Sequence, residues 1–140
     1  MPLRPAPAAA PPSWAAWRGS GRILVIDDDT TIRTALVRSV ANLGFAVDEA
    51  AEGEGGLEAF EADPRRYALV ILDYRLPGMD GNEVAARLRE IRPDVRLIFM
   101  SGVTREEILD GFDAPDSAGY LQKPFSLSGL VAELRGALEP

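Results

Sequence analysis

The chain alternates short apolar runs with segments of helical period, and it does so five times from Arg22 onward. The apolar runs have the length of strands and are mostly β-branched or aromatic: RILVID (22–27), FAVDEA (45–50), YALVILD (67–73), VRLIFM (95–100) and GYLQK (119–123). The third and fourth runs each hold at least four consecutive apolar residues and look buried on both faces, so helices are expected to cover both sides of these strands. The alternation therefore predicts an α/β protein built on a parallel sheet.

Each segment that follows a run carries apolar residues at helical spacing. The five predicted helices are marked, in order, by Ile32, Ala35, Leu36, Val40 and Leu43; by Leu57 and Phe60; by Val84, Leu88 and Ile91; by Ile108, Leu109 and Phe112; and by Leu127, Leu130, Val131, Leu134 and Leu138. Gly44 is expected to follow the end of the first helix, and Ser126 is expected to be the N-cap of the fifth. Pro64 and Pro93 end the second and third.

Five such units in a row predict a single doubly wound (βα)5 domain of the flavodoxin-like type. Crossovers between parallel strands are almost always right-handed, and this rule leads us to expect a five-stranded sheet of order 2-1-3-4-5. In such sheets ligands bind beyond the carboxyl ends of the strands, at the switch point between the first and third. The candidate site is therefore expected at that edge.

Composition excludes several classes of function. The 140 residues suit one domain, and the net charge of -7 disfavours binding to nucleic acid or to anionic membranes. The chain has no cysteine and no histidine, which removes thiol chemistry, catalytic triads, histidine-bound zinc and any phosphohistidine within this chain. No apolar run approaches the roughly 20 residues that span a bilayer. We expect a cytoplasmic monomer or weak dimer with no membrane insertion.

The first residues differ in character from the rest. They read MPLRPAPAAAPPSWAAWRGSG and hold five of the eleven prolines. Such a segment lacks the apolar core of a signal peptide and stays extended, so residues 1–20 are predicted to be a flexible tail or linker and residues 21–140 the folded domain. Trp14 and Trp17 leave open that the tail docks on the domain or on a partner.

Polar residues from four segments are expected to meet at the carboxyl edge of the sheet. They are Asp27, Asp28 and Asp29 after the first strand, Asp73 at the end of the third, Ser101 after the fourth and Lys123 at the end of the fifth. Each has an ordinary alternative: the acidic run can cap a helix, Ser101 can close a turn, and Lys123 can be a surface charge or a purely structural partner of Asp73. Their convergence at one edge is what favours a functional site.

Three neighbouring carboxylates repel one another, and proteins relieve such repulsion either by raising a pKa or by binding a cation, of which the cation is the simpler solution here. A ligand set made only of oxygen favours Mg2+, with Mn2+ as an alternative, over zinc or copper. Phosphoryl transfer needs a metal, a cationic side chain and a hydrogen-bond donor around the transferred group, and the last two can be Lys123 and Ser101. Asp73 is then placed as a carboxylate nucleophile.

The motifs ILVIDDD, LVILDYRLPGMDG, IFMSG and GYLQKPF, taken together, resemble the CheY-like receiver domains of two-component response regulators. The resemblance runs from Arg22 to Leu138. It implies the following roles: Asp73 as phosphoacceptor; Asp28 as the main metal ligand, assisted by Asp27 and by the backbone carbonyl of Arg75; Ser101 and Tyr120 as switch residues; Lys123 as a contact to the phosphoryl group; and a cis peptide before Pro124.

The resemblance also implies partners and a mode of action. The phosphoryl donor is expected to be a histidine kinase or a histidine phosphotransfer protein. The output is expected to pass to a protein partner through the face built from the fourth helix, fifth strand and fifth helix. The domain would be no enzyme beyond its own phosphorylation and dephosphorylation. FMSG, LQKPFS and the Pro/Ala tail are most similar to C-terminal receivers of hybrid histidine kinases; a single-domain regulator or a fragment of a longer protein stays open.

Some features depart from the family's pattern or admit other interpretations. Arg75 and Val103 lie near the expected path of an attacking water, and DGFDAPDSAG (110–119) predicts a short or frayed fourth helix. A magnesium-dependent phosphatase of the haloacid dehalogenase class also uses a strand-end aspartate, but it needs a second aspartate where this chain has Arg75. A degenerate receiver that only binds partners is the third interpretation.

Overall fold

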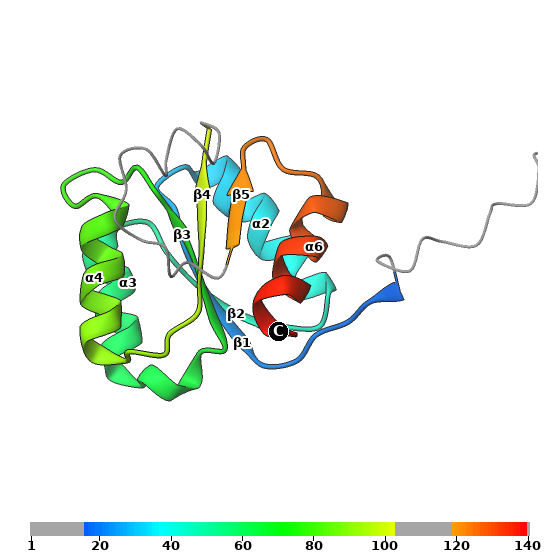
Figure 1. Ribbon diagram of the computed structural model, residues 1–140. Helices are drawn as coiled ribbons and strands as arrows, with labels where there is room; N and C mark the ends of the chain where they lie inside the picture. Colours follow the sequence, from blue (N-terminus) through cyan, green and yellow to red (C-terminus); the bar gives the residue numbers. More distant parts are fainter. Residues whose placement is uncertain (1–15, 103–118, 140) are drawn as a thin grey trace, which may run out of the picture.

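The computed structural model describes residues 16–102 and 119–139 (Figure 1). The described strands are β1 (Arg22–Ile26), β2 (Ala46–Ala50), β3 (Leu69–Asp73), β4 (Leu97–Ser101) and β5 (Gly119–Gln122). The described helices are α2 (Thr30–Asn42), α3 (Gly53–Ala62), α4 (Gly81–Ile91) and α6 (Leu127–Leu138), with a short 3-10 turn η1 (Pro64–Arg66) before β3. The predicted fourth helix, with Ile108, Leu109 and Phe112, lies outside the described residues, as does Val103.

The five strands form one parallel sheet of order β2-β1-β3-β4-β5, which confirms the predicted order. β1 lies between β2 and β3, with Ile26 opposite both Ala50 and Leu72. Asp73 is opposite Met100 on β4, and Ser101 is opposite Gln122 on β5. Because all strands run the same way, the residues that end them lie along a single edge of the sheet.

Helices cover both faces of the sheet, with α2 and α6 on one side and α3 and α4 on the other (Figure 1). Successive residues of a strand point to opposite faces, and in β1 Ile23 and Val25 enter the core beneath α2 and α6, while Leu24 and Ile26 enter the core beneath α3 and α4. β3 and β4 are buried along their whole length, as their continuous apolar character predicts.

Polar side chains begin three of the four described helices. Asp29, Asp80 and Ser126 accept hydrogen bonds from backbone N–H groups in the first turns of α2, α4 and α6. The predicted cap at Ser126 is therefore confirmed. Gly44 follows the end of α2 with a φ of 105°, a conformation that glycine adopts without a steric penalty.

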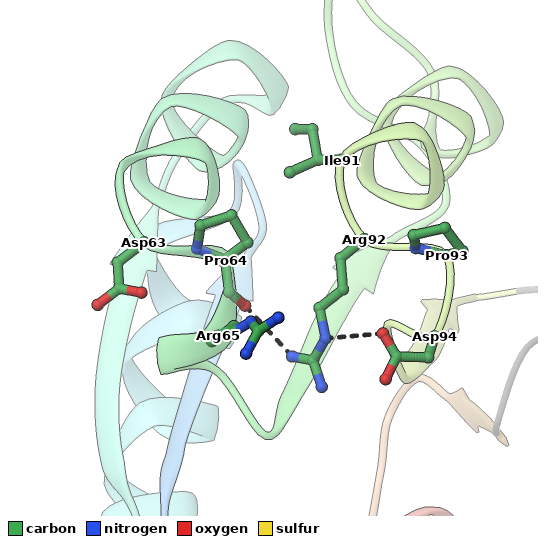
Figure 2. Close-up of a pocket in the computed structure, with 7 residues that line it drawn as sticks. All are labelled: Asp63, Pro64, Arg65, Ile91, Arg92, Pro93 and Asp94. Atoms are coloured by element: carbon green, nitrogen blue, oxygen red, sulfur yellow. Dashed lines mark hydrogen bonds and ion pairs between the residues drawn. The ribbon is translucent and has the colours of Figure 1, made fainter.

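At the amino-terminal ends of the strands, the side chain of Arg92, which follows α4, bonds to the segment that precedes β3. Its Nη1 donates to the carbonyl oxygens of Pro64 at 3.2 Å and Tyr67 at 2.7 Å, and its Nε donates to Asp94 Oδ1 at 3.0 Å. Figure 2 shows this guanidinium beside a cavity of about 730 Å3 that Asp63 and Arg65 also line. With these bonds made, Arg92 serves as a tie between α4 and the start of β3.

Trp17 also packs at the amino-terminal ends of the strands. The sequence had left open whether the tail with Trp14 and Trp17 docks on the domain. Its ring centroid lies 5.9 Å from that of Phe45, and its Nε1 donates to Glu139 Oε1 at 3.0 Å. The N–H of Gly19 donates to the carbonyl oxygen of Leu43 at 2.8 Å and satisfies an acceptor at the end of α2. The chain is therefore packed against the domain from Trp17 onward.

Candidate functional site

Three aspartates meet at the carboxyl edge of the sheet. Asp27 directly follows β1 and Asp73 ends the neighbouring β3, so both side chains arrive at the switch point of the fold. Carboxylate oxygens of Asp27, Asp28 and Asp73 all lie within 4.8 Å of one another. Asp27 is 0% exposed and Asp73 4% exposed, whereas Asp28 is open to solvent. The cluster therefore has two buried carboxylates and one accessible one.

Lys123 brings the counter-charge from β5. Its Nζ lies 3.1 Å from Asp73 Oδ2 and 3.2 Å from Asp27 Oδ2, and its side chain is 17% exposed. The backbone N–H of Lys123 donates to the carbonyl oxygen of Ser101 at 2.7 Å, which holds this end of β5 against β4. The peptide bond between Lys123 and Pro124 is cis.

The charges of the cluster do not balance, and the pKa values reflect this. Burial, followed by the charge of Asp27, raises the pKa of Asp73 to about 6, although Lys123 acts in the opposite direction. Burial lowers the pKa of Lys123, but Asp73 and Asp27 outweigh it and raise the pKa overall. Asp27 Oδ2 is buried and accepts no hydrogen bond within the described part of the chain. Negative charge therefore remains uncompensated at this edge.

A divalent cation fits this donor set. The available donors are carboxylate oxygens, which hard cations such as Mg2+ prefer, and one of the three carboxylates is open to incoming water or ligand. Arg75 borders the cluster, since its N–H donates to Asp73 Oδ1 at 3.3 Å while its side chain points to solvent.

Ser101 and Tyr120 lie together at the end of β4. Ser101 is 3% exposed, and its carbonyl oxygen accepts from the backbone N–H of Lys123 and, at 3.5 Å, from the hydroxyl of Tyr120. The Tyr120 ring is half-buried and packs against the core beneath α3 and α4. One carbonyl thus links the predicted switch residues to the lysine of the acid cluster.

Sequence reasoning did not single out two residues that shape this edge. Arg33 in α2 donates from Nη1 to the carbonyl oxygen of Asp27 at 2.7 Å. A Cβ at Gly81 would lie 2.7 Å from Tyr74 Cα and 2.9 Å from the carbonyl oxygen of Asp73, so glycine lets α4 begin against the end of β3. A basic residue one turn into a helix that follows an acidic run is a sequence pattern that could have pointed to Arg33. No local sequence pattern reports the close backbone approach at Gly81.

A doubly wound parallel sheet with an acidic pocket typical of a phosphoacceptor aspartate and Mg2+ binding defines the receiver class of two-component signalling. The chain belongs to the response regulator receiver domain family, whose model matches residues 23–135. Receiver domains are signalling modules rather than classical enzymes, and they bind Mg2+ through a cluster of acidic residues such as the one found here. Family membership sets aside the haloacid dehalogenase interpretation.

Known relatives differ in how much of their length the chain covers. It is 35% identical over 117 residues to the response regulator receiver protein CpdR of Brucella abortus (strain 2308), covering 84% of this chain and 96% of CpdR. It is 34% identical over 121 residues to the sensor kinase CckA of the same strain, covering 86% of this chain but only 13% of CckA. It is 41% identical over 129 residues to the transcriptional regulatory protein TcrA of Mycobacterium tuberculosis (strain ATCC 25618 / H37Rv), covering 89% of this chain and 49% of TcrA.

Solved structures agree with this assignment. The response regulator TrrA of Thermotoga maritima, solved in complex with Mg2+ and BeF, has a TM-score of 0.76 at 30% identity, with 84% of this chain and 99% of that chain covered. The receiver domain of the hybrid histidine kinase CckA has a TM-score of 0.72 at 27% identity, with 85% and 100% covered. Across residues 16–102 and 119–139, no helix combines the length and apolarity needed to cross a bilayer.

Proposed function

We propose that this receiver accepts a phosphoryl group on Asp73 from a histidine kinase or a histidine phosphotransfer protein, with Mg2+ bound beside it. The observation that supports this most directly is the cluster of Asp27, Asp28 and Asp73 oxygens within 4.8 Å, with Lys123 Nζ at 3.1 Å from Asp73 Oδ2. The positions of the other site residues at the carboxyl edge of the sheet support a role for each of them.

Asp73 is the nucleophile of the proposed transfer. With a pKa of about 6 its carboxylate is largely ionised at neutral pH, and one of its oxygens forms the new bond to phosphorus as the bond from phosphorus to the donor imidazole breaks. The imidazole keeps the electron pair and takes up a proton from water. Lys123 then contacts an oxygen of the bound phosphoryl group as its counter-charge.

Asp28 and Asp73 would hold the cation, with Asp27 assisting and the backbone carbonyl of Arg75 as a further ligand. The buried Asp27 Oδ2 supports this set, because it faces only the ammonium of Lys123 among the described residues, at 3.2 Å, and shares that ammonium with Asp73, so a cation would add the missing positive charge. When bound, Mg2+ supplies positive charge next to the phosphoryl oxygens.

The donor must be another protein or a separate domain, since the chain contains no histidine. A predominantly apolar groove of about 490 Å3, lined by Ile32, Ala35 and Phe125 among others, borders Lys123. Leu127, at the start of α6, is 44% exposed and is the one large hydrophobic residue left exposed among those described. A donor that approaches Asp73 therefore meets a predominantly apolar surface beside the site.

Phosphorylation is proposed to act on a partner through Ser101 and Tyr120. The Ser101 hydroxyl would move toward the new phosphoryl oxygens, and Tyr120 lies against the same carbonyl, so a shift at Ser101 reaches β5 directly. The proposed output face combines β5 and α6 with the predicted fourth helix, which lies outside the described residues. The lifetime of the phosphorylated form is proposed to depend on Arg75, whose side chain is exposed beside the site.

The test is incubation with Mg2+ and acetyl phosphate, followed by intact-mass measurement and hydroxylamine treatment. A receiver gains one labile phosphoryl group per chain, and Asp73→Asn gains none. Asp63→Asn, at an exposed aspartate on the opposite edge, is the matched control and should gain the group normally. Normal labelling of Asp73→Asn would overturn the assignment. Continuous release of phosphate would identify a phosphatase, and the absence of any mass gain a degenerate receiver.

A further inference from the structure

Arg33 joins three elements at the acid cluster. It lies in the first turns of α2, and its guanidinium donates from Nη1 to the carbonyl oxygen of Asp27 at 2.7 Å and from Nε to Glu49 Oε1 at 2.9 Å. Asp27 follows β1 and Glu49 is on β2, so one side chain connects a helix to the ends of two adjacent strands. The side chain of Arg33 is only 13% exposed, which limits its freedom to move.

The carbonyl that Arg33 holds belongs to the peptide unit between Asp27 and Asp28. A change in the ψ angle of Asp27 would turn this rigid peptide plane and shift the Cα and side chain of Asp28 relative to Asp27 and Asp73. The Asp28 side chain is exposed to solvent, so its closeness to Asp27 and Asp73 depends on where the backbone places its Cα. Asp27 is also fixed on its other side, where its N–H donates to the carbonyl oxygen of Ala50 at 3.1 Å.

Glu49 gives this arrangement its electrostatic balance. An unpaired guanidinium next to the cluster would repel a bound cation, and a largely buried one would be costly without a partner. The Glu49 carboxylate, 2.9 Å from Nε, compensates the charge of Arg33, while a different nitrogen, Nη1, donates to the carbonyl oxygen of Asp27. Arg33 can therefore restrain the backbone with little loss of negative potential at the metal site.

We infer that Arg33 is a positioning residue for the cation site: it fixes the peptide between Asp27 and Asp28, and Glu49 holds Arg33 in place and balances its charge. The inference rests on the proposed function, because it assigns a residue that supports Mg2+ binding by the same acid cluster. Arg33 itself touches neither the cation nor the phosphoryl group.

Calorimetric titration with Mg2+ alone tests this on the full chain. Arg33→Ala should raise the Kd for Mg2+ about tenfold, the scale typical of residues that orient metal ligands. Arg33→Lys keeps the charge but reaches only one of the two acceptors, and should give an intermediate Kd. Glu49→Gln keeps an acceptor for Nε but leaves the guanidinium uncompensated, and should weaken Mg2+ binding by a smaller factor.

Arg87→Ala is the matched control, because Arg87 pairs with Glu83 on an exposed face of α4 at 3.4 Å. It should bind Mg2+ as the wild type does. A positioning role also requires that the Arg33 variants, at saturating Mg2+, regain close to the wild-type rate of phosphorylation by acetyl phosphate. A purely structural role would instead lower the unfolding midpoint in EDTA and leave the Kd unchanged.

The outcomes separate this inference from the proposed function. If the wild type neither binds Mg2+ nor gains a phosphoryl group, the proposed function fails. If the wild type does both and Arg33→Ala binds Mg2+ within twofold of it, only the inference fails. If Arg33→Ala does not fold, Arg33→Lys and Glu49→Gln decide, since a wild-type Kd in both would overturn the inference.

Discussion

The ammonium of Lys123 lies 3.1 Å from Oδ2 of Asp73, although the two residues are 50 positions apart in the chain. The same ammonium is 3.2 Å from Oδ2 of Asp27. One positive charge shared by two buried carboxylates leaves an excess of negative charge at the edge of the sheet. Burial of Asp73, followed by the charge of Asp27, raises the pKa of Asp73 to about 6. The excess determines how the protein should respond to pH, to Mg2+ and to substitution.

Asp73→Asn should stabilise the metal-free protein at neutral pH. Folding raises the pKa of Asp73 from 3.8 to about 6. The free energy of unfolding of the wild type therefore decreases as the pH rises through that interval. The variant removes this loss and should be more stable by about 3 kcal/mol at pH 7, a difference that shrinks toward zero as the pH falls below 4. Urea unfolding in EDTA at several pH values measures it. A difference that does not vary with pH would contradict the assigned cause.

Binding of Mg2+ should weaken as the pH falls through 6. The cation competes with the proton for Asp73, and below its pKa the apparent affinity should fall by about tenfold per pH unit. Above pH 7 the affinity should level off because the carboxylate is already ionised. Calorimetric titrations between pH 5 and 8 measure this, and a flat profile would show that Asp73 is not a ligand.

Lys123→Met should have opposite effects on metal binding and on chemistry. Loss of the ammonium removes a cation that competes for Asp73 and Asp27, so Mg2+ should bind several-fold more tightly. The same loss removes the counter-charge for the phosphoryl oxygens, so phosphorylation by acetyl phosphate should slow by about a hundredfold. The two measurements are made on one preparation. Equal weakening of both would indicate a damaged fold instead.

Trp17→Ala should destabilise the domain without changing its phosphorylation. The substitution removes the ring contact with Phe45 and the hydrogen bond to Glu139, and should cost about 1 to 2 kcal/mol of unfolding free energy. Trp17→Phe keeps a ring on Phe45 and should cost less. Both should accept one phosphoryl group per chain, because Trp17 lies at the edge opposite Asp73. An unchanged unfolding midpoint in Trp17→Ala would show that the docking contributes nothing to stability.

The helix α3 shows where local sequence signals fail. Leu57 and Phe60 predict a short helix, yet α3 begins at Gly53, in a glycine-rich stretch of low helix propensity. The structure explains this: a Cβ at Gly56 would collide with Ile26 Cδ1, and one at Gly53 would lie 2.8 Å from Val84 Cγ2. Close packing against β1 and α4 outweighs the propensity, and no local pattern reports such a contact.

The sequence by itself determined the strand order and the gathering of Asp27, Asp73, Ser101 and Lys123 at one edge, because hydrophobic period and right-handed crossovers act locally and leave few topologies open. Only the tertiary structure decided that Lys123 bridges two carboxylates, that Arg33 holds the backbone of Asp27, and that Trp17 docks on Phe45. These contacts depend on the three-dimensional positions of the side chains, which the separation of the residues along the chain does not predict.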